Sequence, residues 1–131
     1  MVKIIRREDV PVDTEYEKGL AINFGIDKYS AGSKRIVMGY TVVPPGNRNQ
    51  RHYHANCEAS MFILKGRLRF FIGEEKKEYD VGPMTFVYAP QGEIHALQNL
   101  SGTETAELIF AYGCVPTKED AGTTFLEKPC V

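Results

Sequence analysis

The chain has 131 residues, of which 43% are hydrophobic and 25% are charged, and its formal net charge is −1. We expect one domain over residues 1–131, because a chain of this length buries a core without disulfides or a structural metal. The near-neutral charge argues against a nucleic-acid or anionic-membrane partner. No apolar run reaches the ~20 residues of a membrane span, and the N-terminus lacks the apolar core of a signal peptide. We therefore expect a cytoplasmic protein with no membrane partner.

Strand signals dominate the chain from its start. Apolar runs at residues 2–7 and 20–24 come first, and the β-branched segment at residues 34–43 stops at Pro44-Pro45-Gly46. Gly66 separates two further runs and predicts a tight hairpin or a sharp bend. These and the remaining strands are expected at residues 51–54, 60–65, 67–72, 84–90, 93–99 and 105–113.

Only the C-terminal region has a helical pattern. Thr117 and Asp120 are spaced as in a capping box and Gly122 follows as a stop, so residues 116–122 are expected to form one or two helical turns. Short strands at a spacing of about 8–12 residues predict an all-β sandwich or barrel. Runs such as "MFIL" and "RFFI" are apolar on both strand faces, which implies either a packed second sheet or a subunit interface, and we expect a homodimer.

The three cysteines are Cys57, Cys114 and Cys130. An odd number argues against a disulfide framework, so we expect buried or tail thiols in a reducing compartment.

The chain has three histidines, and each follows a turn signal. His52 and His54 are one residue apart, so on a strand both rings point to the same face. His95 comes shortly after Pro90 and Gly92. Neutral imidazoles paired in this way suit Zn, Cu, Fe or Ni, whereas an isolated H-x-H can also be two surface histidines that bind nothing.

The two histidine segments resemble the two motifs of the cupin superfamily, at residues 46–66 and 82–99. The matching residues of the first motif are Gly46, His52, His54, Glu58 and Gly66. Those of the second motif are Pro90, Gly92, His95 and Asn99.

The resemblance implies a double-stranded β-helix, or jelly-roll barrel, with one divalent metal inside. By this resemblance His52, His54 and His95 hold the metal together with a glutamate, and open positions accept water, dioxygen or substrate. Fe, Mn, Zn, Ni and Cu all accept such ligands.

Two positions depart from the family pattern. The family spacing places the glutamate at Ala59, so Glu58 stands one residue early, and a slip of one residue turns a strand side chain to the opposite face. Either a β-bulge turns Glu58 inward, or the site has three histidines. In the second motif the family glycine falls at Met84, and we expect Gly82 to take over the turn.

Four residues are candidates for a pocket beside the metal. Met61 and Ile63 share the parity of Ala59 and are expected to point into the barrel, as pocket wall or as core. Phe86 and Tyr88 share one face of the strand before Pro90, and Tyr88 could offer a hydroxyl to a ligand. This wall is mostly apolar, which indicates a small-molecule substrate of low polarity.

Two functions are consistent with these residues. The first is a metal-dependent enzyme of the oxygenase, lyase or isomerase type that acts on a small organic molecule. The second is a non-catalytic module that binds a small molecule or sugar. The three retained histidines favour the enzyme.

Overall fold

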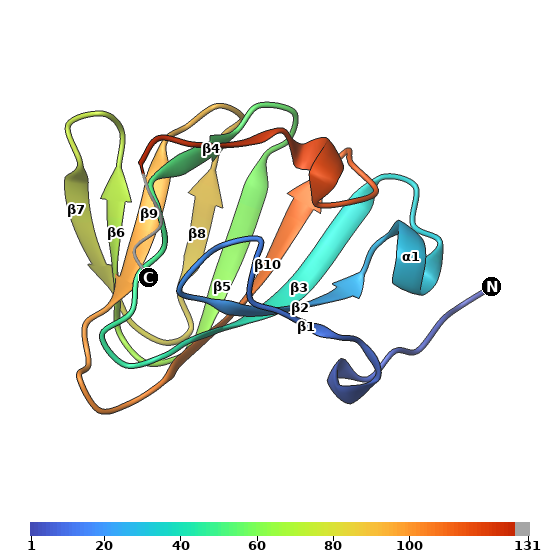
Figure 1. Cartoon of the computed structure of the whole chain (residues 1–131), viewed down its shortest axis with the longest axis horizontal. Helices are drawn as coiled ribbons and strands as arrows, with labels where there is room; N and C mark the ends of the chain where they lie inside the picture. The colour runs from blue at the N-terminus through green and yellow to red at the C-terminus, as the bar shows by residue number, and fades with distance from the viewer. Residues whose placement is uncertain (128–131) are drawn as a thin grey trace.

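The structure is a computed structural model that describes residues 1–127, and it is built almost entirely from β-strands (Figure 1). The strands are β1 (Val12–Asp13), β2 (Ala21–Ile26), β3 (Ile36–Val43), β4 (His52–His54), β5 (Ala59–Lys65), β6 (Leu68–Ile72), β7 (Lys77–Val81), β8 (Phe86–Ala89), β9 (His95–Asn99), β10 (Ala106–Gly113) and β11 (Thr123–Phe125). The helical turns are η1 (Arg7–Asp9), α1 (Lys28–Ala31) and η2 (Glu119–Ala121).

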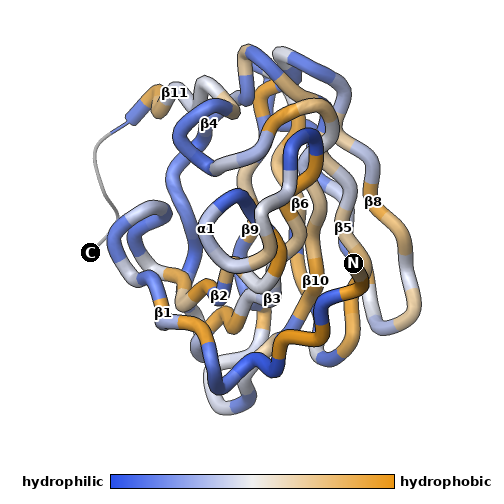
Figure 2. Tube along the Cα trace, turned by 90° about the vertical axis from the view of Figure 1, so that its right-hand side faces the viewer, coloured by the Kyte–Doolittle hydropathy of each residue, from blue (hydrophilic) through white to orange (hydrophobic). Residues whose placement is uncertain are grey.

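The strands form two antiparallel sheets. One sheet has six strands in the order β1-β2-β3-β10-β5-β8, and the other has five in the order β11-β4-β9-β6-β7. Strand β10 lies between β3 and β5, although both come much earlier in the chain. Figure 2 shows long hydrophobic stretches along these neighbouring strands. The predicted all-β jelly roll is confirmed.

Alternation along β10 shows how the six-stranded sheet faces the core. Ala106, Leu108, Phe110 and Tyr112 are buried, while the residues between them are half-buried. Gly39 on β3 makes room for the ring of Phe110, since a Cβ at that position would lie 2.4 Å from a ring atom. The inner surface is therefore close-packed, and a larger residue at position 39 would displace Phe110.

Gly66 is a bend between the sheets, because β5 belongs to the six-stranded sheet and β6 to the other. Its φ is 89°, and a Cβ there would lie 2.8 Å from Cβ of Ala106. Both the left-handed backbone and the close approach require glycine. The bend turns the apolar sides of β5 and β6 toward one core.

The N-terminal prediction is wrong. Residues 2–7 form no strand, Val2 and Ile4 are exposed, and the N-terminal end projects from the body (Figure 1). An apolar run becomes a strand only where a neighbouring strand offers backbone groups. The short strands β1 and β11 and the helix α1, which Asp27 caps with Ser30, were not predicted.

Two local turns were predicted from the sequence. The helical turn at Glu119–Ala121 is confirmed, with Thr117 and Asp120 in hydrogen-bond contact. The expectation for Gly82 is wrong, because the left-handed residue is Met84 itself, at φ 63°. Met84 thus adopts the left-handed conformation that favours glycine, at a steric cost of about 1–2 kcal/mol.

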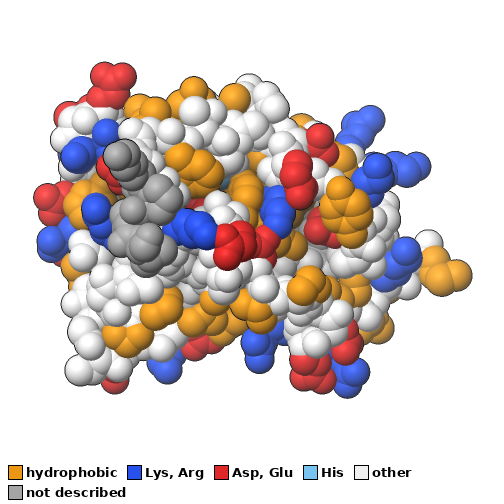
Figure 3. Space-filling view, in the orientation of Figure 1, with side chains coloured by type: hydrophobic (Ala, Val, Ile, Leu, Met, Phe, Trp, Pro, Cys, Tyr) orange, Lys and Arg blue, Asp and Glu red, His pale blue; other side chains and the backbone are white. Residues whose placement is uncertain are grey.

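The remaining sequence predictions concern cysteines and surfaces. Cys57 is buried and Cys114 exposed, both as free thiols, while Cys130 lies outside the described residues. Among residues 1–127, no helix combines the length and apolar content needed to cross a bilayer. Figure 3 shows hydrophobic side chains scattered among charged ones on one side of the molecule.

Candidate metal centre

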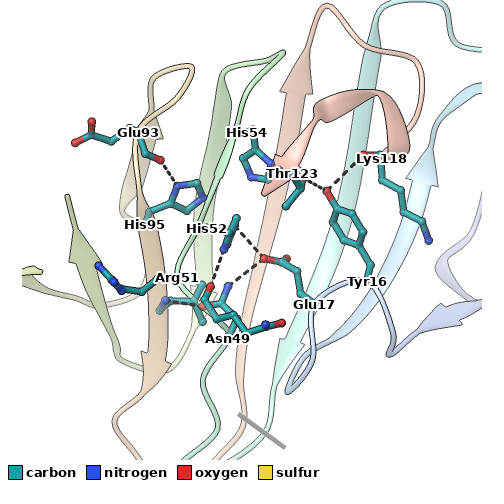
Figure 4. A network of polar contacts seen from close by, with 12 residues as sticks. Tyr16, Glu17, Asn49, Arg51, His52, His54, Glu93, His95, Lys118 and Thr123 are labelled. Atoms are coloured by element: carbon teal, nitrogen blue, oxygen red, sulfur yellow. Dashed lines mark hydrogen bonds and ion pairs between the residues drawn. The ribbon is translucent and has the colours of Figure 1, made fainter. Parts of the chain in front are cut away.

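The fold brings the three histidines together from two neighbouring strands. His52 and His54 point inward from β4, and His95 on β9 is the direct antiparallel partner of His52. One nitrogen from each ring lies within 4.8 Å of the others (Figure 4). The predicted trio therefore forms one cluster, although His95 is far from the other two in the sequence.

Two of the rings are oriented by backbone carbonyls. Nδ1 of His52 donates to the carbonyl of Gln50 at 2.7 Å, and Nδ1 of His95 donates to the carbonyl of Glu93 at 2.9 Å. A carbonyl oxygen only accepts, so each Nδ1 carries the proton and each Nε2 keeps a lone pair. Both Nε2 atoms thus keep a lone pair that can bind a cation.

The third ring is oriented by a hydroxyl. Nδ1 of His54 lies 2.8 Å from Oγ1 of Thr123, which also contacts the hydroxyl of Tyr16. Tyr16 donates in turn to the carbonyl of Lys118 at 3.5 Å. In this chain Thr123 donates to Tyr16 and accepts from His54, which leaves Nε2 of His54 with a lone pair as well.

Burial keeps the three imidazoles neutral. Desolvation lowers the pKa of His52 and of His95 to about 4, and desolvation together with the neighbouring histidines lowers the pKa of His54 to about 2. Neutral imidazole is the form that binds metals. The rings surround a chamber of about 30 Å³, which has room for one small ion or water. This donor set fits one divalent transition metal.

The sequence profile of the Cupin domain matches residues 39–112, a segment that contains all three histidines. The chain belongs to the cupin family. The match also covers both motifs from Gly46 to Asn99, so the resemblance drawn from the sequence is confirmed.

Two relatives of this cupin are Streptomyces proteins. Protein SchB of Streptomyces halstedii is 25% identical over 126 residues, which are 96% of this chain and 88% of SchB. Polyketide synthase CurC of Streptomyces cyaneus is 28% identical over 109 residues, which are 78% of this chain and 64% of CurC.

Solved structures have the same fold. The polyketide cyclase RemF from Streptomyces resistomycificus matches with a TM-score of 0.78 at 21% identity, over 98% of this chain and 87% of RemF. Oxalate decarboxylase from Bacillus subtilis matches with a TM-score of 0.77 at 22% identity, over 96% of this chain and 33% of the enzyme.

The structure corrects the placement of Glu58. It is exposed, and its Oε1 accepts a hydrogen bond from the hydroxyl of Tyr88 at 2.8 Å. Strand β5 begins directly at Ala59, whose side chain is buried in the family position and lines the chamber. No bulge turns Glu58 inward, and among residues 1–127 the cluster consists of the three histidines.

The predicted pocket residues separate into three groups. Met61 lines the histidine chamber, whereas Ile63 is fully buried in the core. Phe86 and Tyr88 are exposed on edge strand β8. Both border a second cavity of about 340 Å³, which also touches Met61 and His95. This cavity lies beside edge strands β7 and β8 and adjoins the chamber.

Sequence reasoning missed Glu17, which the structure buries beside the cluster. Its Oε1 lies 3.1 Å from Nε2 of His52 and accepts a hydrogen bond from Nδ2 of Asn49, also at 3.1 Å (Figure 4). Burial raises the pKa of this carboxyl group. Neither Glu17 nor Asn49 belongs to a motif position that matched, so no spacing signal pointed to them.

Proposed function

We propose that this cupin is an enzyme that converts a small, mostly apolar carbonyl compound at a divalent metal. The observation that carries the proposal is the convergence of three buried, neutral imidazoles whose Nδ1 atoms are all engaged elsewhere. A bound metal would supply Lewis-acid polarisation of a carbonyl oxygen. Under this proposal His52, His54 and His95 hold the ion.

The cavity beside the chamber supports a substrate of low polarity. Its volume of about 340 Å³ lies within the usual range for small-molecule sites, about 300–1,000 Å³. Its lining is mostly apolar or aromatic: Met61, Phe70, Ile72, Tyr79, Val81, Phe86, Val87, Tyr88, Ala89, Pro90, Glu93 and His95. Met61 and His95 also line the chamber, so a ligand in the cavity could place one polar end at the histidines.

Ring closure of a polyketide is the reaction class that we propose. The names of two similar proteins, polyketide cyclase RemF and polyketide synthase CurC, favour it. An internal aldol closure of a chain of alternating carbonyls is an isomerisation, and the loss of water that follows is a lyase-type step. Both belong to the reaction types expected from the sequence, and neither consumes dioxygen.

The residues of the chain would contribute binding and shape to this reaction. Apolar walls such as Phe70 and Val87 would hold the hydrocarbon part in a folded conformation and keep water away from it. Met61 lies between the cavity and the chamber and would set which carbon approaches the histidines. Positioning of this kind is a large part of catalysis for an intramolecular reaction.

Elemental analysis and turnover together test the proposal. We expect about one metal per wild-type chain and almost none in His52→Ala and His95→Ala. Metal-loaded wild type should also accelerate the closure of a short linear triketone to a resorcinol and water, followed by ultraviolet absorbance. Equal, sub-stoichiometric metal in all three proteins would refute the metal site.

The alternative is a non-catalytic cupin that binds a small molecule. It predicts that the triketone or its ring product binds, for example by calorimetry, while the rate of closure stays at the metal-free background. Binding without acceleration would therefore favour the module over the enzyme.

We also propose a homodimer, as the strand pattern predicts. Exposed apolar residues on β3, β5 and β8 support it: Ile36, Met38, Leu64, Phe86 and Tyr88. Light scattering should give twice the chain mass for wild type and a smaller mass for Met38→Glu combined with Leu64→Glu. A wild-type monomer at micromolar concentration would contradict the dimer.

A further inference from the structure

We propose that Glu17, from the segment before β2, is the carboxylate ligand of the metal centre and replaces the motif glutamate, whose position Ala59 occupies in this chain. The inference rests on the proposed metal site and adds a fourth protein ligand to its three histidines. It depends on the contacts of Glu17 with His52, on the support of its side chain, and on the environment of Ala59.

The contact between Glu17 and His52 joins two acceptors. Nδ1 of His52 already donates to Gln50, so Nε2 presents its lone pair to Oε1 of Glu17 across 3.1 Å. Two lone pairs this close repel each other unless a proton or a metal cation lies between them. A divalent ion bound by both atoms removes the repulsion and satisfies both groups.

The distance also suits a shared ion. Two ligands at right angles around a metal, each with a bond of about 2.1–2.2 Å, lie roughly 3.0–3.1 Å apart. The separation of 3.1 Å between Oε1 of Glu17 and Nε2 of His52 has this value. Glu17 also lines the same chamber as His54 and His95. The carboxylate is thus close to the position of a metal ligand.

Asn49 holds the Glu17 carboxylate and connects it to the strand of His95. Its Nδ2 donates to Oε1 of Glu17, while its Oδ1 accepts the backbone N–H of Leu97 on β9 at 2.8 Å. Asn49 is itself 3% exposed, so water does not substitute for it. Such a partner orients a metal ligand from outside, as hydrogen bonds do for the histidines.

The backbone after Glu17 is fixed against the first motif. Gly19 has a φ of 94°, and a Cβ there would lie 2.3 Å from the carbonyl oxygen of Arg48. The carbonyl of Gly19 accepts from Nδ2 of Asn47 at 3.1 Å. These contacts anchor the segment beside residues 47–49, which lead directly into β4. Glu17 therefore reaches the histidines from a supported backbone.

Ala59 explains why the site has room for this carboxylate. Ala59 occupies the family glutamate position, is buried and lines the chamber. Among the described residues that line the chamber, Glu17 is the only carboxylate. A methyl group at position 59 supplies no ligand, and Glu58 points to solvent. The chain has thus exchanged a ligand on β5 for one on the N-terminal segment.

Titration of the metal-free protein with Mn²⁺ tests the inference, with Glu58→Gln as a matched control for Glu17→Gln. We expect Glu17→Gln to bind Mn²⁺ at least about ten-fold more weakly than wild type, as loss of a ligand or its support commonly does. Glu58→Gln should match wild type within about two-fold, because an exposed carboxylate outside the cluster contributes little. Calorimetry gives the affinities, and circular dichroism checks that Glu17→Gln is folded.

Infrared difference spectra provide a second measurement, which reports on the carboxylate group itself and not on the affinity. Addition of Mn²⁺ to wild type should shift one carboxylate stretching band, and the shift should be absent in Glu17→Gln and present in Glu58→Gln. If wild type binds Mn²⁺ with no carboxylate shift, or if Glu17→Gln binds it as tightly as wild type, the role of Glu17 is refuted. In both cases loss of binding in His52→Ala would leave the three-histidine site standing, whereas a wild type that binds no metal would overturn the proposed function itself.

Discussion

Glu17 and Glu58 have opposite environments in the same small barrel. Glu17 is buried against His52 and Asn49, and its pKa is raised by burial, whereas Glu58 is exposed and accepts one hydrogen bond from Tyr88. Burying a carboxylate is costly unless a cation or several donors compensate for lost water. The buried carboxylate of Glu17 therefore requires a compensating partner, whereas the exposed carboxylate of Glu58 is solvated by water. The unfavourable free energy of burying a carboxylate thus points to a functional site as clearly as a sequence motif does.

The largest expected effect is a loss of stability of the metal-free protein at acidic pH, which comes from the buried histidines beside Glu17. The unfolded chain takes up protons on its histidines near pH 6.5, but the folded, metal-free chain resists protonation, since the pKa of His52 and of His95 lies at about 4 and that of His54 at about 2. Between these values the unfolded state binds more protons, so stability falls as the pH falls. Each such histidine contributes about 1.4 kcal/mol per pH unit below pH 6.5, so the three together lose on the order of 10 kcal/mol by pH 4.

Urea unfolding at a series of pH values measures this loss. Glu17 acts in the opposite direction, because a raised pKa favours the folded state at low pH and its contribution is lost as the pH rises. The three histidines outnumber it, so the free energy of unfolding should still decrease from pH 7 to pH 4. A flat profile would mean that the histidines are not buried as described.

Asn49→Ala should produce the next largest effect. The change leaves the N–H of Leu97 without its side-chain acceptor and removes one donor from Glu17. A buried group left unsatisfied costs about 1–3 kcal/mol, and Mn²⁺ affinity should fall in parallel with that of Glu17→Gln. Denaturant unfolding and calorimetry measure the two effects. Unchanged stability would show that Asn49 does not link Glu17 to β9.

The sequence predicts the histidine cluster well because all three histidines stand at recognisable motif spacings. The one-residue gap between His52 and His54 fixes their common face as soon as β4 forms. His95 follows from the second motif, and the bend at Gly66 follows from its glycine. The jelly roll itself is predicted by many short strands with frequent turns. These features depend on spacing, which a sequence displays.

The residues around the cluster were not predictable in the same way. Glu17 and Thr123 meet the histidines only after the N-terminal segment and β11 have packed against β4. No short-range pattern encodes such contacts. The apolar run at residues 2–7 shows the reverse failure, because its local pattern is that of a strand but no strand lies beside it. Spacing therefore identified the motif residues, and folding determined their partners.

Thr123→Val should moderately reduce both Mn²⁺ affinity and stability, because Thr123 contacts His54. The variant keeps the side-chain shape but removes the oxygen that accepts from Nδ1 of His54. Loss of an orienting partner typically weakens metal binding about 10–100-fold, and a buried hydrogen bond contributes about 1 kcal/mol to stability. Thr124→Val, on the exposed neighbouring residue, is the matched control. Equal Mn²⁺ affinities in the two variants would remove Thr123 from the site.

Tyr88→Phe should have the smallest effect, because it removes only the exposed hydrogen bond to Glu58. Water can replace the lost donor at an exposed carboxylate, so neither Tm nor Mn²⁺ affinity should change measurably. The substitution also tests whether Glu58 is free to move, since the Tyr88 hydroxyl is its hydrogen-bond partner in this structure. If Glu58 were able to swing inward and bind metal, releasing it from Tyr88 would raise Mn²⁺ affinity, and the double variant Tyr88→Phe with Glu58→Gln would lose that gain. An unchanged Mn²⁺ affinity in both variants would show that Glu58 does not bind the metal even without its hydrogen bond to Tyr88. Glu17 would then be the one carboxylate proposed as a ligand.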